Sequence, residues 1–193
     1  MEMRTLGRTG LQVSRLGLGA AEIGLRLTLA DTAQAAEVLN TALDAGVNYV
    51  DTAACYGVSE ELIGRTIAHR RGEYTLATKC GHVTGGYQGE PWTAQTIRDS
   101  VDRSLVRMRT DRVDLMQLHS CDRATLERGE VVQACWKPGR QGRPASSATA
   151  ATTRPRRGPS PAACSIPSRP ASAWWINGPW SISSLRPKPG GWA

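Results

Sequence analysis

The sequence predicts an α/β fold with a parallel sheet over its first 134 residues. Two observations predict this fold: short strands alternate with amphipathic helices, and the strands are apolar almost without interruption. Strands of a parallel sheet have this composition because crossover helices cover both of its faces. The pattern leaves open whether the sheet is open and doubly wound or closed into a barrel.

The first half of this segment contains a hairpin, two strands and a helix. Residues 3–13 alternate in polarity around a Gly-Arg-Thr-Gly turn, which predicts a β-hairpin. Residues 13–19 form a short strand that ends in glycine, and residues 47–51 form the second strand. Between them, apolar residues recur with the helical period from Thr32 until Gly46 ends the helix.

The second half repeats the alternation. Ser59 is placed to cap a helix, and residues 74–79 follow it as the third strand. A further amphipathic helix precedes residues 113–119, which form the fourth strand. A fourth helix begins near Arg123 and runs to Ala134. Four strand-helix units are therefore expected.

Composition changes abruptly after Ala134. The chain has a net charge of +7, but residues 1–134 carry 15 Lys+Arg against 17 Asp+Glu. Residues 135–193 carry nine basic residues and no acid, with ten of the 11 prolines and five of the six tryptophans. Because the excess positive charge is confined to this tail, we expect no nucleic-acid or membrane partner for the first segment. The tail has no apolar period, so we expect it to be irregular and disordered.

A reading-frame shift offers an explanation for the tail. Back-translated and read one base earlier, the codons of residues 135–137 force Leu-Glu where the fourth helix should continue. The codons of residues 174–180 force Val-Asp and permit L-V-D-Q-W-A-L, a string that suits one of the later strands of the interrupted fold. We therefore interpret residues 135–193 as the product of a frameshift. The other interpretation takes the tail at face value, as a basic interaction arm.

Polar side chains stand where three of the predicted strands end. Asp51 ends the second strand, with Tyr56 in the loop after it, Lys79 ends the third, and His119 ends the fourth. Parallel α/β folds place their active sites at the carboxyl ends of the strands. Each residue also has an ordinary explanation, as a helix cap, a packing ring or a solvated cation, so their joint placement is the stronger signal.

These residue types can act together in proton transfer. A tyrosine is a weak acid at neutral pH, and a nearby ammonium stabilises its anion. A buried lysine requires a counter-charge, which Asp51 can supply, and a histidine can orient a carbonyl group through a hydrogen bond. With these neighbours, the tyrosine could protonate an alkoxide that forms when a cofactor delivers a hydride.

Three stretches of the chain resemble the aldo-keto reductase family. D-T-A-A-C-Y-G at residues 51–57 resembles the family segment that carries an Asp and the catalytic Tyr. T-K-C at residues 78–80 resembles the segment with the catalytic Lys, and residues 99–119 resemble the third-helix and fourth-strand signature. The resemblance covers about residues 1–134. Within the family, this sequence most resembles the branch that includes aldose and galactose dehydrogenases and channel-subunit-like reductases.

The resemblance implies an eight-stranded (β/α)8 TIM barrel, of which this chain carries an N-terminal half-barrel of four strand-helix units followed by the irregular tail. It implies a reductase of aldehydes and ketones, or an alcohol or aldose dehydrogenase, that uses NADP or NAD. The catalytic residues it implies are Tyr56 as proton donor, Lys79 and Asp51 as the ion pair that adjusts the acidity of Tyr56, and His119 as the residue that directs the carbonyl. It also implies that Gly19, Ala20 and Asp51 lie near the nicotinamide, and that the substrate is a small carbonyl compound or sugar.

A zinc site is an alternative from another class of function. Cys80 and His82 form C-x-H, and His119 and Cys121 form H-x-C, at the ends of adjacent strands. Alternate residues of a strand point the same way, so the four side chains could converge on Zn²⁺. Zinc spacings in proteins are usually wider, so we expect no metal among the catalytic groups.

Further expectations follow from composition and strand number. Five widely spaced cysteines and an N-terminus without an apolar signal core favour a reducing cytoplasm. Four strands cannot close a barrel, so we expect self-association through exposed sheet edges. The family's contacts to the far end of the dinucleotide come from later strands, so competence of this chain does not follow from its catalytic side chains.

Overall fold

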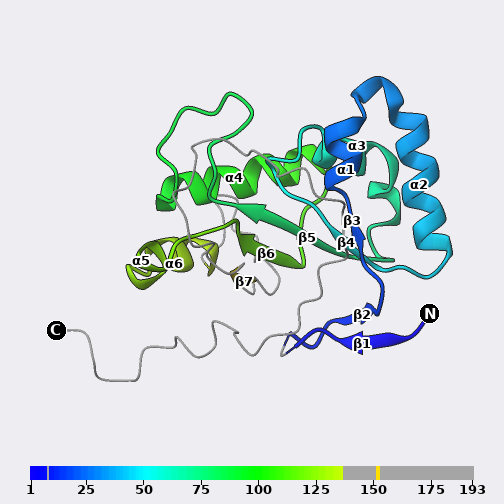
Figure 1. The fold of residues 1–193 in the computed structure, drawn as a ribbon, viewed down its shortest axis with the longest axis horizontal. Coiled ribbons are helices and arrows are strands. Elements are labelled where there is room, and N and C mark those ends of the chain that lie inside the picture. The colour runs from blue at the N-terminus through cyan, green and yellow to red at the C-terminus, as the bar shows by residue number, and fades with distance from the viewer. Residues whose placement is uncertain (8, 137–150, 153–193) are drawn as a thin grey trace.

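The fold is built around a sheet of parallel strands, as the computed structural model of the chain shows for residues 1–7, 9–136 and 151–152 (Figure 1). In their order across the sheet the strands are β3 (Leu18–Gly19), β4 (Tyr49–Asp51), β5 (Thr75–Cys80), β6 (Leu115–Leu118) and β7 (Ala151–Thr152). Each strand pairs in parallel with the next one along the chain. A doubly wound sheet reverses its strand order at a switch point, whereas a barrel does not. The described strands therefore follow barrel order.

Helices connect the strands and cover the sheet. They are α1 (Ala21–Arg26), α2 (Thr32–Asp44), α3 (Ser59–Thr66), α4 (Ala94–Arg107), α5 (Arg123–Glu127) and α6 (Glu130–Trp136), with 3-10 turns η1 (Leu29–Asp31) and η2 (Ala68–Arg70). They follow the sheet in chain order, from α2 and α3 near β3 and β4 to α5 and α6 near β6 (Figure 1). Every residue of β5 and of β6 is buried, although Thr75, Thr78 and Lys79 in β5 and Gln117 in β6 interrupt the apolar sequence.

The opening hairpin is confirmed. Strands β1 (Met3–Thr5) and β2 (Gln12–Ser14) pair antiparallel and lie apart from the parallel sheet (Figure 1). Asn48, just before β4, fastens the hairpin: its Oδ1 accepts from the Ser14 N–H at 2.6 Å, and its N–H donates to Ser14 Oγ at 2.9 Å. This attachment divides the strand expected at residues 13–19 between β2 and β3.

Two helix boundaries differ from the sequence prediction. Ser59 is the first residue of α3 rather than its cap, which is Val58. Its hydroxyl donates instead to the carbonyl of Ala20 at 2.9 Å, so it joins α3 to the end of β3. The single helix expected from Arg123 is two helices, because Gly129 lies between them with φ +75, a left-handed backbone that ends α5.

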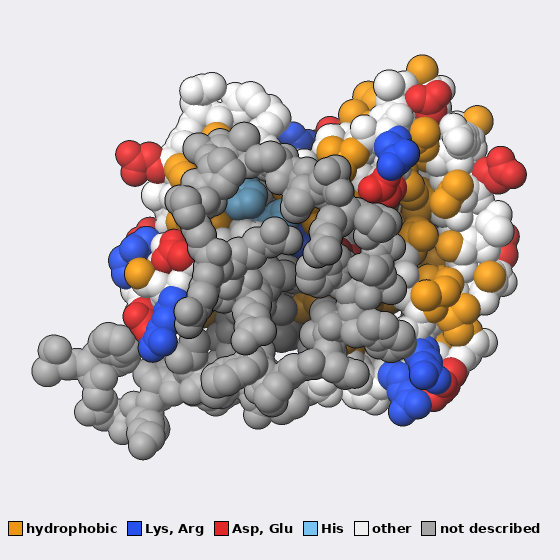
Figure 2. Space-filling model, in the orientation of Figure 1, with side chains coloured by type: hydrophobic (Ala, Val, Ile, Leu, Met, Phe, Trp, Pro, Cys, Tyr) orange, Lys and Arg blue, Asp and Glu red, His pale blue; other side chains and the backbone are white. Residues whose placement is uncertain are grey.

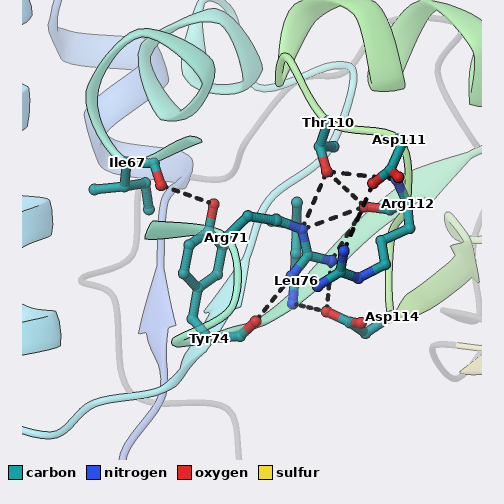
Figure 3. Close-up of polar contacts among 8 residues, drawn as sticks. All are labelled: Ile67, Arg71, Tyr74, Leu76, Thr110, Asp111, Arg112 and Asp114. Atoms are coloured by element: carbon teal, nitrogen blue, oxygen red, sulfur yellow. Dashed lines mark hydrogen bonds and ion pairs between the residues drawn. The ribbon is translucent and has the colours of Figure 1, made fainter. Parts of the chain in front are cut away.

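Arg71 joins β5 and β6 at the edge of the sheet where these strands begin (Figure 3). Its guanidinium donates to the carboxylate of Asp114 at 2.7 Å and to the carbonyls of Tyr74 at 2.9 Å and Arg112 at 3.1 Å. The same Asp114 oxygen accepts from the N–H of Leu76 at 2.8 Å. This network fixes the start of both strands, at the end of the sheet opposite the polar strand-end residues.

The fifth strand, β7, lies within the tail that the sequence predicts to be irregular. Gln117 and Leu118 of β6 pair with Ala151 and Thr152, respectively. Residues 137–150 and 153–193 lie outside the described part of the chain, so the expectation of disorder falls on residues that the structure does not describe. Among the described residues, no helix has the length and apolar character needed to cross a membrane.

Candidate active site

The strand-end residues meet at one edge of the sheet. Asp51 ends β4, Lys79 is the penultimate residue of β5, and His119 follows β6 directly. Parallel pairing in register brings these ends together, since Asp51 pairs with Ala77 and Lys79 with Gln117. Contacts among their side chains bring the four candidate residues together.

A buried ion pair forms the centre of the site. Lys79 Nζ donates to Asp51 Oδ2 at 2.5 Å and to the carbonyl of Thr52 at 2.8 Å. The side chains of Lys79 and Asp51 are 7% and 28% exposed. A charge removed from water in this way requires a partner, and each of these charges has one.

Gln117 is a site residue that the sequence analysis missed. Its Nε2 donates to Asp51 Oδ1 at 2.9 Å, so Lys79 and Gln117 engage different oxygens of the same carboxylate. Gln117 is 5% exposed and precedes His119 by two residues, which puts it on the same face of the strand. A polar side chain in an otherwise apolar strand was the signal that could have identified it.

Tyr56 lies between the cation and the imidazole. Lys79 Nζ is 4.9 Å from the centroid of the Tyr56 ring. The rings of Tyr56 and His119 are edge-to-face, with centroids 5.7 Å apart and an interplanar angle of 88°. The ring of Tyr56 is therefore held by contacts with two of the other three candidate residues, Lys79 and His119.

His119 is held as a neutral imidazole. Burial, followed by the neighbouring His82 and Lys79, lowers the pKa of His119 to about 3. Its Nδ1 lies 3.3 Å from the sulfur of Cys55, and its ring stacks on that of His82 with centroids 4.8 Å apart. Burial also lowers the pKa of His82. At neutral pH both rings can accept or donate a hydrogen bond without carrying charge.

The loop after β5 places His82 in this group. Gly81 has φ +111, and a Cβ built on it would lie 2.1 Å from the ring of Trp92, so only glycine fits. Trp92 in turn contacts the His82 ring edge-to-face, with centroids 5.5 Å apart. The left-handed turn at Gly81 interrupts the strand, and the alternation of side chains along β5 therefore does not extend to His82.

Gly19 and Ala20 lie beside Asp51 but differ in exposure. Gly19 pairs with Asp51, is exposed, and has no atom within 4 Å of where a Cβ would be. Ala20 is fully buried, and its N–H donates to the carbonyl of Asp51 at 2.8 Å. Its carbonyl accepts from Ser59 Oγ. Only Gly19 of this pair offers open space.

The four-residue zinc site suggested by the sequence is not assembled. Cys80 lies 3.9 Å, sulfur to sulfur, from Cys135 of α6, and Cys80 and Cys121 are 2% and 0% exposed. Among the described residues, the metal-ligating side chains that gather are instead Cys55, His82 and His119. The turn at Gly81 is the physical reason, because it separates the direction of His82 from that of Cys80.

Comparison with known proteins identifies the class of this fold and site. The Aldo/keto reductase family model matches residues 15–144, and the chain belongs to this family of oxidoreductases. The chain is 32% identical over 150 residues to L-galactose dehydrogenase of Arabidopsis thaliana, covering 74% of this chain and 46% of the relative. It is 33% identical over 142 residues to D-threo-aldose 1-dehydrogenase of a Pseudomonas species, covering 61% and 43%.

A solved structure gives the same result. The crystal structure of PA4992 from Pseudomonas aeruginosa superposes with a TM-score of 0.61 at 40% sequence identity, covering 68% of this chain and 53% of that one. The described strand-helix units thus represent part of an aldo-keto reductase TIM barrel. The chain spans about half the length of the relatives it matches.

Proposed function

We propose that the site carries the chemistry of an NAD(P)H-dependent carbonyl reductase, or of the reverse alcohol or aldose oxidation, with Tyr56 as the general acid. The observation that carries this proposal is the position of Lys79, which is bonded to Asp51 while its ammonium lies 4.9 Å from the Tyr56 ring. An ammonium at this position stabilises the phenolate that remains when the tyrosine gives up its proton.

Asp51 and Gln117 act as positioning residues in this proposal. Asp51 holds the Lys79 ammonium against the carbonyl of Thr52, and Gln117 holds the Asp51 carboxylate. These hydrogen bonds restrict the position of the Lys79 ammonium. The charge beside Tyr56 is therefore fixed before a substrate arrives, which favours the charged product of proton transfer.

His119 orients the substrate carbonyl. A neutral imidazole carries one N–H, and when Nδ1 accepts from the Cys55 thiol the proton resides on Nε2. That N–H is then available to a carbonyl oxygen next to the Tyr56 hydroxyl. The low pKa of His119 keeps this arrangement intact across the neutral range, because the ring does not charge there.

The open space at Gly19 fits a nicotinamide ring. A bound NADP or NAD would supply the hydride that reduces the carbonyl carbon. Gly19 ends β3 next to Asp51, so a flat ring above it would lie at the same sheet edge as Tyr56. Ala20 and Asp51 would bound this space from the sheet side.

The relatives support a small carbonyl compound or a sugar as the substrate. Two of them are named for oxidation of L-galactose and of aldoses. We propose the same substrate class for this chain, because the match to each of these relatives covers more than half of it. Residues 135–193, as the product of a frameshift, would lack the loops that select one sugar from another.

The domain boundary at Ala134 is part of the same proposal. The family match continues to residue 144 and α6 runs to Trp136, so both extend past Ala134, where the composition changes. Reading the gene through the codons of residues 134–135 decides the frameshift: a neighbouring frame that continues the barrel is expected, and its absence contradicts the idea.

An activity assay should distinguish the 193-residue chain from a protein in which the reading frame is restored. We expect the frame-restored protein, but not the 193-residue chain, to oxidise NADPH with a panel of aldehydes, ketones and aldoses. In the restored protein, Tyr56→Phe should lower kcat by about 10²–10⁴-fold, the usual contribution of a general acid, while NADPH binding persists. Tyr87→Phe, which removes a hydroxyl bonded to Asp99 outside the site, is the control. No activity in either form overturns the assignment.

A further inference from the structure

Three side chains that bind soft metal ions gather beside the candidate catalytic groups. The ligand atoms of Cys55, His82 and His119 all lie within 4.8 Å of one another. We propose that these three residues form a binding site for a single soft divalent cation of the Zn²⁺ type. The site differs in composition from the cysteine-rich one that the sequence spacing suggested.

The distances are close to those of a tetrahedral site. Zn–S and Zn–N bonds of about 2.3 and 2.0–2.1 Å separate the ligand atoms from each other by roughly 3.3–3.6 Å. The sulfur of Cys55 and Nδ1 of His119 are 3.3 Å apart, within this range. His82 stacks on His119, so its ring must rotate out of the stack and its ligand atom must move by about 1 Å, from within 4.8 Å of the other two, to complete the tetrahedral set.

The three ligands come from three loops that are already tied together. Thr84 Oγ1 donates to the carbonyl of Ala54 at 3.4 Å, which joins the loop after β5 to the segment that carries Cys55. The N–H of His119 donates to the carbonyl of Cys80 at 2.9 Å, which joins the end of β6 to that of β5. Little backbone movement is therefore required when the cation binds.

The donor set and its surroundings suit a cation. Two imidazoles and a thiolate are ligands that Zn²⁺ prefers, and three protein ligands leave a fourth position open, as in catalytic zinc sites. Cys55 binds as a thiolate, and its proton passes to solvent. The nearby positive charge of Lys79 is compensated by Asp51 at 2.5 Å. All three ligands are partly buried, and histidine side chains reach the surface in Figure 2.

Protection of the Cys55 thiol tests the proposal on the unaltered chain. The 193-residue protein, reduced and stripped of metal, is alkylated with iodoacetamide with and without saturating Zn²⁺, and each cysteine is followed by peptide mass spectrometry. We expect Zn²⁺ to slow alkylation of Cys55 selectively. Equal rates at Cys55 in both samples overturn the proposal, whether or not any variant folds.

Cobalt binding identifies the ligands. Co²⁺ should bind one per chain, with a thiolate-to-cobalt charge-transfer band, and Zn²⁺ should displace it. Cys55→Ser and His82→Ala should each weaken binding by more than the roughly 10- to 100-fold that loss of an outer-shell partner costs. His69→Ala, which removes an exposed histidine, should leave it unchanged. Binding that survives Cys55→Ser but is lost in Cys121→Ser contradicts the site.

Discussion

Gln117 donates its side-chain amide to Asp51 Oδ1 at 2.9 Å, while Lys79 engages the other oxygen of the same carboxylate. Both oxygens of a largely buried carboxylate are thus satisfied by side chains of neighbouring strands. This relationship makes Gln117 part of the candidate site, although it touches neither Tyr56 nor His119 in any contact described above.

Replacement of Gln117 by leucine should therefore destabilise the protein. The substitution keeps the size and burial of the side chain but leaves Asp51 Oδ1 without this donor. An unsatisfied buried acceptor costs about 1–3 kcal/mol in the free energy of unfolding, measured by urea denaturation at fixed chain concentration. Gln88→Leu, at an exposed position, is the matched control. Equal urea midpoints for the two variants would contradict the role.

The sequence revealed the site in part because of where its residues stand. Asp51 and His119 end apolar runs, so their positions mark the sheet edge before any contact is known. Gln117 lies inside such a run, and its partner Asp51 is 66 residues away. No pattern in one chain reports which buried carboxylate a buried amide will meet, so this bond had to come from the structure.

The fold could be predicted to a similar extent. Strands with few polar interruptions predicted the buried sheet of β5 and β6, and both are buried throughout. The division of the fourth helix at Gly129 and the turn at Gly81 depend on left-handed backbone at single residues, which apolar periodicity does not report. The two-residue strand β7 is also too short to give a periodic signal.

Acid should destabilise the protein through His119. Its pKa is about 3 in the folded chain, against an ordinary value of 6.5. Above pH 6.5 the ring is neutral in both states, and the stability it contributes is complete. As the pH falls from 6.5 toward 3, the unfolded chain takes up a proton that the folded chain does not, so the free energy of unfolding decreases.

Urea midpoints between pH 7 and pH 4 measure this dependence. His119→Gln cannot titrate, so its midpoint should fall less steeply than that of the wild type over this range. Some slope should remain, because burial also lowers the pKa of His82. His69→Gln, at an exposed position, should retain the full wild-type slope. Parallel curves for wild type and His119→Gln would refute the assignment.

Glu60 should give the opposite pH dependence of stability from His119. It is 1% exposed, and burial raises its pKa above the ordinary 4.5 despite hydrogen bonds from Thr78 at 2.7 Å and Arg107 at 3.4 Å. The folded chain thus holds its proton more tightly, so the stability that Glu60 contributes is complete below pH 4.5 and decreases as the pH rises. Glu60→Gln should raise the urea midpoint at pH 7 relative to wild type, and this gain should vanish near pH 4. Glu37→Gln, on an exposed part of α2, should shift neither midpoint.

Arg71 should tolerate even a charge-conserving change poorly. A lysine cannot reproduce the fork that reaches the Asp114 carboxylate and the carbonyls of Tyr74 and Arg112 at once (Figure 3). Arg71→Lys should lower the free energy of unfolding by about 1.5–3 kcal/mol, the usual value of a hydrogen bond to a charged group. Arg65→Lys, on the exposed face of α3, should change it by less than about 0.5 kcal/mol. Equal urea midpoints for the two lysine variants would show that the network does not hold the strands.

The 193-residue chain should self-associate through its sheet edges. In the described part of the chain, β3 pairs only with β4, and β7 pairs only with β6, so each has one side without a partner strand. Unpaired backbone groups at such an edge are available to a strand of another molecule. Sedimentation velocity should therefore show a coefficient that rises with chain concentration. In the frame-restored protein the later strands would pair with both edges and close the barrel, so the same measurement should show no such rise. A 193-residue chain that stays monomeric at every concentration contradicts the prediction.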